Sequence, residues 1–568
     1  MNEYILSLIV FLPLLAALVL LFIDSKRAEL IRAVGLVVAL MTFVLSLSLP
    51  HHFVQGQKGF QFECLLLWIP QFSINYHVGI DGISLLLILL TTFITPLVLL
   101  ASWTDIKDKV KAYIVCMLLL ETGMIGVFVS LDLILFYVFW EAMLIPMYFL
   151  IGIWGGPRRV YAAVKFFIYT MVGSVLMLVA ILVLYFAAQP EHTFDLIALT
   201  EIHPLTGWLG LIAFGAFALA FAIKVPMFPF HTWLPDAHVE APTAGSVILA
   251  AVLLKMGTYG FLRFCLPLFP EASIACAPII SALAIIGIIY GALVAMAQTD
   301  IKKLVAYSSV SHLGFVMLGI FAFNMQGMSG SLLQMLNHGL STGALFLIVG
   351  MIYERRHTRQ IADFGGIARV VPVLTVCFLL ATLSSIGLPG LNGFVGEFLI
   401  LLGTFQVNPT YAIFATFGIV LGAAYMLRMF RSVMYGPLDK EENASLKDLN
   451  AREIAVLVPV ILCMFWIGLY PKWFLSTMDA SIQEVQGIVL RADHEGSNTT
   501  RQPLSGPAAP EVGPGGSFPV AVPPAPETGE PIAHLAPDDT SPPNATQDEG
   551  VGHRHRDATT NRIGEVTP

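Results

Sequence analysis

Charged residues are scarce in this sequence. Only 12% of the 568 residues are Asp, Glu, Lys or Arg, whereas about a quarter of a soluble globular domain is charged. Hydrophobic residues make up 57% of the chain, and the mean hydropathy is +0.79. This composition excludes an ordinary soluble protein and indicates a chain that lies largely within a membrane.

Motifs for cofactors and for cleavable targeting segments are also missing. The six cysteines are scattered without a CxxC spacing, which favours small buried hydrophobic residues over disulfides or iron–sulfur ligands. The sequence has no glycine-rich phosphate loop, no HExxH, no nucleophile elbow and no nucleic-acid patch. We therefore expect this chain to bind no cofactor and no metal. The first apolar segment has neither a basic region before it nor a cleavage site after it, so we expect it to be a retained helix.

Long apolar runs are abundant. A helix needs about 20 predominantly apolar residues to cross a hydrocarbon core of about 30 Å. Fourteen segments meet this requirement, which predicts an all-α polytopic membrane protein. They begin near Tyr4, Leu30, Ile83, Tyr113, Leu131, Val164, Leu209, Thr243, Ile274, Leu304, Ser331, Val370, Thr410 and Ile454.

Basic residues are distributed unevenly among the connections between these segments. Twenty of the 30 Lys and Arg residues lie in connections after segments 1, 3, 5, 9, 11 and 13, and connections after even-numbered segments hold only Lys58 and Arg263. The positive-inside rule then places the odd connections in the cytoplasm and both termini on the opposite side. The connection after segment 7, His231 to Pro242, has Asp236 and Glu240 but no Lys or Arg. We expect that stretch to be embedded in protein.

Two glutamates lie inside neighbouring apolar segments, where an ionisable group costs at least about 2.5 kcal/mol and is a functional candidate for that reason. Glu121 and Glu141 stand about ten residues on either side of a turn near Leu131, at a common depth of about 15 Å. If they face each other, they titrate as a coupled pair. The alternative is that each only bonds a polar group on a neighbouring helix.

Two lysines are equally out of place. Lys224 precedes a stretch with prolines at 226, 229 and 235 that obstruct a continuous helix. Broken backbone at membrane depth persists only where it is buried in protein or lines a wet cavity, so we expect Lys224 beside a hydrated break. Lys255 lies about eight residues before Arg263, without a short route to the membrane surface. Snorkelling is the alternative for Lys224, whereas a desolvated lysine that releases its proton near neutrality suits a relay.

A second interruption precedes Glu397. The run Ser384-Ser-Ile-Gly-Leu-Pro-Gly-Leu-Asn-Gly393 breaks segment 12, and segments 7 and 12 cross in opposite directions because they lie five apart. Interrupted helices at matching positions are typical of inverted repeats with ion sites at the breaks. We predict two inverted five-helix repeats, formed by helices 4–8 and 9–13, with discontinuous helices 7 and 12.

His312 and His338 lie among hydroxyl residues in segments 10 and 11. Imidazole titrates near neutrality and can pass protons along water, although a satisfied interhelical hydrogen bond accounts for each histidine nearly as well. Asp81, Asp132 and Asp300 stand at predicted helix ends, where capping or pairing is at least as probable as transport.

These features divide the chain into five parts. We assign 1–112 to the three N-terminal helices, 113–264 to a first proton half-channel repeat, 265–432 to a second, inverted repeat, and 433–490 to a cytoplasmic connection and the last helix. Residues 491–568 are rich in Pro, Gly, Ser and Thr and bury too little apolar surface to offset their ordering entropy. We expect a disordered tail on the non-cytoplasmic side.

Several runs resemble the family of antiporter-like subunits of respiratory NADH-quinone oxidoreductase and Mrp-type cation/proton antiporters. They are Phe136-Tyr-Val-Phe-Trp-Glu-Ala-Met-Leu-Ile-Pro146, the Lys224 to Pro242 stretch, Gln298-Thr-Asp-Ile-Lys-Lys-Leu-Val-Ala-Tyr-Ser-Ser309, Ser311-His-Leu-Gly314 and Gly387-Leu-Pro-Gly-Leu-Asn-Gly-Phe-Val-Gly-Glu397. The resemblance covers about residues 1 to 490. Glutamate at 397 is typical of the M-type branch, whereas L and N types carry lysine there. We also expect no long lateral amphipathic helix after segment 14, which argues against the L type.

The resemblance implies a function for these residues. Glu141 and Lys224 would form an ion pair in the proton-input half, Lys255 would be the central relay, Glu397 would lead to the exit, and His312 and His338 would lie along the axis between. It implies a bacterial inner membrane location, L- and N-type subunits as partners, and NADH, flavin, iron–sulfur clusters and quinone in other subunits. An Mrp-type antiporter subunit and a non-conducting membrane scaffold are the alternatives.

Overall fold

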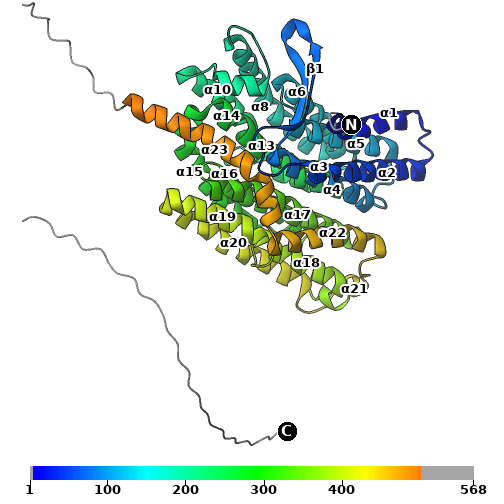
Figure 1. Cartoon of the computed structure of the whole chain (residues 1–568). Coiled ribbons are helices and arrows are strands. Elements are labelled where there is room, and N and C mark those ends of the chain that lie inside the picture. The colour runs from blue at the N-terminus through cyan, green and yellow to red at the C-terminus, as the bar shows by residue number, and fades with distance from the viewer. Residues whose placement is uncertain (1–3, 501–568) are drawn as a thin grey trace, which may run out of the picture. The chain divides into compact units, whose positions relative to one another are not determined.

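The computed structural model describes residues 4–500, which form a bundle of helices with one protruding hairpin (Figure 1). Thirteen helical stretches in this range are long and apolar enough to cross a membrane. Two shorter helices, α18 (Pro372–Ser385) and α19 (Asn392–Val407), together correspond to segment 12. Each of the fourteen predicted segments therefore has a counterpart, and the prediction of a polytopic helical membrane protein is confirmed.

The remaining helices follow the predicted order. In the first half they are α1 (Ile5–Phe22), α2 (Ala28–Ser46), α3 (Ser48–His52), α4 (Gly82–Ala101), α5 (Val110–Val129), α6 (Leu133–Ala142), α7 (Leu144–Trp154), α8 (Arg159–Ala187), α9 (Leu196–Ile202), α10 (Gly207–Lys224), α11 (Trp233–Glu240), α12 (Thr243–Ile248), α13 (Leu254–Gly260) and α14 (Leu266–Leu268). In the second half they are α15 (Pro270–Met296), α16 (Ile301–Ile320), α17 (Met325–Arg356), α20 (Pro409–Met434), α21 (Glu441–Ala444), α22 (Ala451–Leu469) and α23 (Lys472–Thr500).

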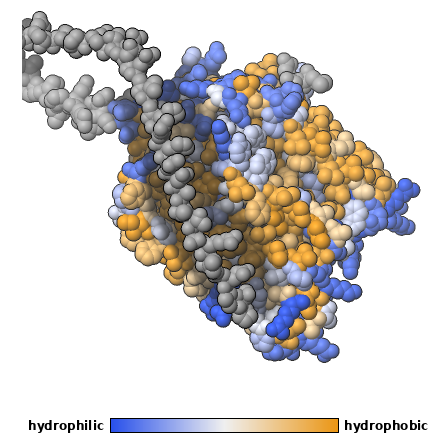
Figure 2. All heavy atoms as spheres, turned by 60° about the horizontal axis from the view of Figure 1, so that its bottom comes forward, coloured by the Kyte–Doolittle hydropathy of each residue, from blue (hydrophilic) through white to orange (hydrophobic). Residues whose placement is uncertain are grey.

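The outer surface of the bundle is apolar. Figure 2 shows hydrophobic residues over much of the face in view and hydrophilic residues gathered toward its ends. Large apolar side chains such as Leu8, Val172 and Phe417 are exposed on the crossing helices. Exposed apolar side chains on crossing helices suit contact with lipid tails, while ionisable side chains such as Lys224 and Lys255 are buried inside.

Both predicted interruptions are present. Segment 7 leaves helical geometry between α10 and α11, and segment 12 does so between α18 and α19. At the first break the indole of Trp233 donates a hydrogen bond of 2.8 Å to the backbone oxygen of Ile223, which satisfies a carbonyl that the broken helix leaves free. At the second break Gly387 and Gly390 adopt left-handed φ values of +75° and +92°, which favour glycine.

The π-helical turns of segment 8 were not predicted. The segments η2 (Leu249–Leu253) and η3 (Phe261–Cys265) flank α13 on its two sides. Their residues are as apolar as those of an ordinary membrane helix, so hydropathy gave no sign of them. The further break at Met143, between α6 and α7, was missed for the same reason.

A β-hairpin is the clearest departure from the all-α prediction. Strands β1 (Gln61–Ile69) and β2 (Ile74–Ile80) pair antiparallel, with Leu66 opposite Tyr76, around the 3₁₀ turn η1 (Pro70–Phe72). The search for apolar runs of membrane length passes over strands this short.

The hairpin is fastened to the bundle by His77. Its Nδ1 lies 2.5 Å from the carboxylate of Asp195, which also caps α9, and its Nε2 lies 3.6 Å from Glu63. Asp132 caps α6 and accepts a hydrogen bond from the backbone of Asn75 in β2. The capping alternative is thus correct for Asp132, and Asp81 and Asp300 cap α4 and α16 in the same way.

The expectation that no long amphipathic helix follows segment 14 is wrong. Helix α23 has 29 residues and contacts α4, α14, α15 and α17. Its buried apolar residues recur at helical spacing and form one stripe: Phe474, Met478, Ile482, Val485 and Val489. The rest of the helix is polar, so its mean hydropathy is too low for the helix to be predicted as a membrane span. The helix continues past the predicted tail boundary at residue 491. The rest of the tail, 501–568, lies outside the described residues.

Candidate functional site

Lys224 ends helix α10 at the first interruption and is buried. Only 1% of the residue is exposed, and its Nζ has no hydrogen-bond partner within the described part of the chain. The ammonium group lies 5.0 Å from the centre of the Trp140 ring and 5.8 Å from that of Phe166. Aromatic faces stabilise a cation that has lost water, so they hold Lys224 inside the bundle. The snorkelling alternative does not describe this side chain.

Glu141 is next to Trp140 on α6, and its charge reaches Lys224. However, Lys224 Nζ and Glu141 Oε1 are both buried without a hydrogen-bond partner among the described residues, so the lysine makes no direct contact with the carboxylate. The ion pair that the resemblance implies is therefore open in this structure. Glu141 is the penultimate residue of α6 and lies two residues before the break at Met143.

Glu121 lies fully buried on α5, and neither of its carboxylate oxygens has a hydrogen-bond partner in the described range. No contact or charge interaction joins it to Glu141 among those residues. The structure therefore does not bring these two glutamates together as a facing pair.

Lys255 begins a line of buried polar side chains. It is fully buried on α13, and its Nζ bonds the backbone oxygen of Ala250 and lies 2.6 Å from Nδ1 of His338. Ala250 belongs to η2, where the π-helical pattern shifts the backbone hydrogen bonds and lets a carbonyl face the lysine. The local irregularity of the helix thus supplies one of the two partners of the lysine.

The line of polar side chains continues from His338 to Glu397. The rings of His338 and His312 lie 5.8 Å apart, and Nδ1 of His312 lies 2.9 Å from Oε1 of Glu397. Glu397 is 4% exposed and also accepts a hydrogen bond of 3.0 Å from Gln334. Lys255, His338, His312 and Glu397 come from α13, α17, α16 and α19, so four helices meet in one polar line. The sequence selected all four of these residues.

Amide side chains fix the second interruption beside this line. Asn337 donates to the backbone oxygen of Asn392 at 2.7 Å, and Asn392 donates in return to the backbone of Asn337 at 3.3 Å. Ser384 donates to the side chain of Asn392 at 2.5 Å. The start of α19 is thereby tied to α17, which fixes the backbone that carries Glu397. Sequence reasoning missed Gln334, Asn337 and Asn392 because uncharged amides in apolar helices usually serve only packing.

His238 was also missed. It is fully buried on α11, neither ring nitrogen has a hydrogen-bond partner among the described residues, and its ring stacks on Phe346 at 4.7 Å. Its electrostatic neighbours are Lys255, Lys302 and His338. The signal was available, since His238 lies in the stretch His231 to Pro242 that lacks basic residues. The prediction that this stretch is embedded in protein is confirmed by the burial of Trp233, His238 and Glu240.

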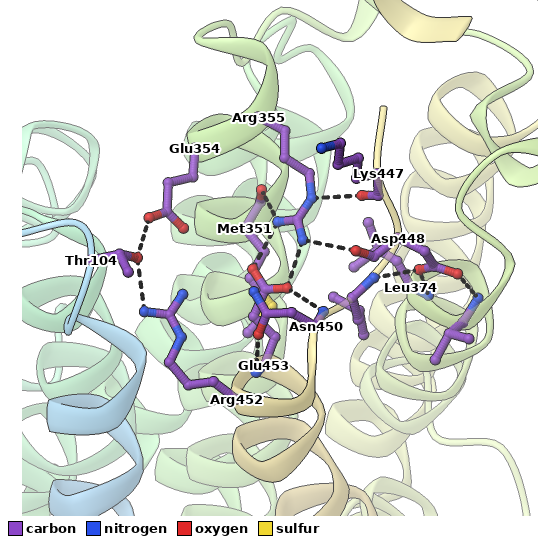
Figure 3. A network of polar contacts seen from close by, with 12 residues as sticks. Thr104, Met351, Glu354, Arg355, Leu374, Lys447, Asp448, Asn450, Arg452 and Glu453 are labelled. Atoms are coloured by element: carbon purple, nitrogen blue, oxygen red, sulfur yellow. Dashed lines mark hydrogen bonds and ion pairs between the residues drawn. The ribbon is translucent and has the colours of Figure 1, made fainter. Parts of the chain in front are cut away.

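A polar network holds the far end of α17 (Figure 3). Arg355 donates to both carboxylate oxygens of Glu453, at 2.8 and 2.6 Å, and Glu453 forms a capping box with Asn450 at the start of α22. Thr104, from the connection between α4 and α5, bridges Glu354 and Arg452 in the same view. The network therefore ties the end of α17, the helix that carries His338, to the start of α22.

The site consists of two parts that are not in contact, one around Lys224 and one that begins at Lys255. Within the described residues no hydrogen bond or charge interaction links Lys224 to Lys255. The same residues hold no group of three or more His, Cys, Asp and Glu side chains that could bind a metal. Crossing helices, two of them interrupted, and ionisable side chains buried among them define a polytopic membrane protein with discontinuous helices.

The family follows from comparison with known proteins. Residues 130–422 match the family described as NADH:quinone oxidoreductase/Mrp antiporter, transmembrane, and residues 5–127 match the amino terminus of NADH-ubiquinone oxidoreductase chain 4. NADH-quinone oxidoreductase subunit M of Rhodobacter capsulatus is 48% identical over 493 residues, covering 84% of this chain and 96% of the relative. The chain 4 protein of Chondrus crispus is 46% identical over 83% of this chain and 95% of its own. The chain belongs to the subunit M family of respiratory complex I.

Solved structures agree with this assignment. A chain of respiratory complex I from Thermus thermophilus with bound NADH superposes with a TM-score of 0.78 at 33% identity, over 85% of this chain and 99% of that one. A chain of the Mrp complex from Dietzia sp. gives a TM-score of 0.75 at 20% identity, over 87% and 99%. The second likeness shows a shared fold alone.

Proposed function

We propose that this chain is a proton-translocating membrane subunit of an NADH-quinone oxidoreductase. Electron transfer from NADH to quinone takes place in partner subunits, which hold NADH, flavin, iron–sulfur clusters and quinone, and this chain binds none of them. Other membrane subunits of complex I, of the L and N types above all, are its neighbours in the bacterial inner membrane. The basic connections face the cytoplasm and both termini face the other side, in agreement with the positive-inside rule.

One observation carries the proposal: the line Lys255, His338, His312 and Glu397, with 2.6 Å between its first two members and 2.9 Å between its last two. Each member has a side chain that can hold or release a proton. The 5.8 Å between the histidine ring centres is short enough for direct approach or for one bridging water. A proton arriving at Lys255 therefore has a route to Glu397 that crosses little apolar distance.

The input half would act as an electrostatic switch. An ion pair at about 4 Å is worth about 4 kcal/mol at an effective dielectric constant near 20, close to a thousandfold in proton occupancy. When Glu141 approaches Lys224 the lysine keeps its proton, and when Glu141 withdraws the proton is released toward Lys255. The open geometry between Glu141 and Lys224 corresponds to the releasing arrangement. Glu121 supplies a second buried carboxylate on the input side, and His238 stands near Lys255 to bridge the gap between the halves.

The experiment is NADH-driven proton uptake by the whole complex in liposomes. Lys224→Met and Glu141→Gln should each reduce the number of protons taken up per NADH and slow coupled NADH oxidation. Glu442→Gln is the matched control, because the side chain of that glutamate is 68% exposed and is far in sequence from the residues of the polar line. Variants at Lys224 and Glu141 that assemble fully and take up protons at the native ratio would support a non-conducting scaffold instead. Sodium-coupled exchange without NADH would support an Mrp-type antiporter, whose fold the chain shares.

A further inference from the structure

A cavity lined in part by charged residues lies on the Arg263 side of Lys255 and has no part in the proposed relay. It is a cavity of about 600 Å³ lined by residues that include Phe60, Asp81, Arg263, Ser481 and Glu484. They come from the connection between α3 and β1, from the start of α4, from η3 and from α23. All of these stand on the side of the membrane that the positive-inside rule makes non-cytoplasmic. A polar cavity of this size holds water readily.

Arg263 is one of the residues that line this cavity. The residue is 4% exposed, its Nη2 lies 2.5 Å from Oδ1 of Asp81, and its Nε donates to the hydroxyl of Tyr259 at 3.2 Å. The guanidinium lies between two rings, 4.9 Å from the centre of Phe60 and 5.4 Å from that of Tyr259. The Tyr259 hydroxyl in turn donates to the backbone oxygen of Phe128 at 3.2 Å. Arg263 is thus held by charge, by hydrogen bonds and by stacking at once.

The cavity comes close to the centre of the relay. Lys255, Tyr259 and Arg263 follow one another at intervals of four residues, so they lie along one side of the helix, with about 12 Å between the first and the last. A water-filled connection over that short distance would let protons pass directly between Lys255 and the cavity. Such a connection would bypass His338 and Glu397 and would dissipate the gradient that the relay builds.

We infer that Arg263, held by Asp81 and Tyr259, is a seal that stops protons from passing between Lys255 and the non-cytoplasmic cavity. Arginine suits this task because its guanidinium stays protonated and has no acceptor, so it neither takes up nor relays a proton. Its charge opposes the approach of another cation, as in other pores that exclude protons. Tyr259 adds a second barrier, because its hydroxyl is already committed to Phe128 and Arg263. The inference rests on the proposed function, since a seal matters only in a chain that conducts protons.

The test measures passive proton leak in the absence of NADH. The whole complex is placed in liposomes with a trapped pH-sensitive dye, and the internal pH is followed after an external acid pulse with valinomycin and potassium present. A unit charge about 12 Å away at an effective dielectric constant near 20 changes the occupancy of an extra proton by about tenfold. Arg263→Met should therefore raise the leak by about tenfold, and Phe60→Ala, which uncovers the outer face of the guanidinium, should raise it less.

Two further variants distinguish a seal from an exit residue and from a packing defect. Asp81→Asn removes the charge partner that holds Arg263 and should therefore raise the leak, but by less than Arg263→Met because the positive charge of Arg263 remains. Loss of uptake without leak in Asp81→Asn would make Asp81 an exit residue and overturn the seal. Lys255→Met combined with Arg263→Met should return the leak to the native level, whereas a leak that persists would show a packing defect. If neither Arg263→Met nor Phe60→Ala leaks while Lys255→Met alone still blocks NADH-driven uptake, the seal fails and the proposed function stands. Native uptake in Lys255→Met would refute the proposed function itself.

Discussion

The replacement Glu397→Gln tests the polar line at the contact between His312 and Glu397. A protonated imidazole and a carboxylate with 2.9 Å between His312 Nδ1 and Glu397 Oε1 attract each other by about 6 kcal/mol at an effective dielectric constant near 20. The glutamine amide keeps a neutral hydrogen bond worth about 1 kcal/mol. Relaxation of the site recovers part of the remainder, so we take about 4 kcal/mol as lost from this contact, which corresponds to about a thousandfold in an equilibrium constant.

The assay compares protons taken up per NADH with the rate of NADH oxidation in liposomes. Glu397→Gln should remove the share of uptake that this chain carries and slow coupled oxidation, while uncoupled oxidation slows less. Glu397→Asp keeps the charge but shortens the side chain, so it should fall between the native chain and the glutamine variant. Native uptake per NADH in a fully assembled Glu397→Gln complex would refute the reasoning, because the protons would then not need the carboxylate.

Three other predictions concern residues around this line. His238→Leu should leave assembly intact, because neither ring nitrogen has a partner among the described residues, yet lower proton uptake per NADH. Burial lowers the pKa of His77, but the hydrogen bond and the charge of Asp195 outweigh burial, so the pKa of His77 is above its usual value. Burial raises the pKa of Asp195, but the hydrogen bond from His77 outweighs burial, so the pKa of Asp195 is below its usual value. The hairpin should therefore lose stability as the pH rises through the folded pKa of His77 and as it falls through that of Asp195, and hydrogen exchange of β2 should show both losses in the native chain and neither in His77→Phe. Arg355→Ala should cost about 3 to 5 kcal/mol because it leaves the Glu453 carboxylate buried without its partner, and an unchanged thermal unfolding temperature would contradict this.

Hydropathy and charge were enough to place the crossing helices and most of the line. Each ionisable residue inside an apolar run carries a desolvation cost that packing alone does not explain, so Lys224, Lys255 and Glu397 stood out against their neighbours. The prolines after Lys224 and the glycines before Glu397 marked the two interruptions, because those residues change backbone geometry directly.

Other features leave weaker marks in a single sequence. The π-helical turns beside Lys255 arise from packing between helices, and their residues fit an ordinary helix equally well. The hairpin depends on pairing between short strands and on the contact between His77 and Asp195, which lie far apart in the chain. The distance between Glu141 and Lys224 depends on tertiary geometry that no spacing rule gives. The inverted relation of the two repeats and the five domain boundaries stay predictions.

Helix α23 places a limit on how this chain can work. It lies across the bundle and touches α4 near the amino-terminal helices as well as α15 and α17 in the predicted second repeat. If the helices around α4 tilted far against α15 and α17, helix α23 would have to bend or lose its contacts with one group, and its apolar stripe would become exposed. We therefore expect turnover to involve rotamer changes and local backbone shifts at the interrupted helices, and not the rigid-body tilting of one group of helices against the other.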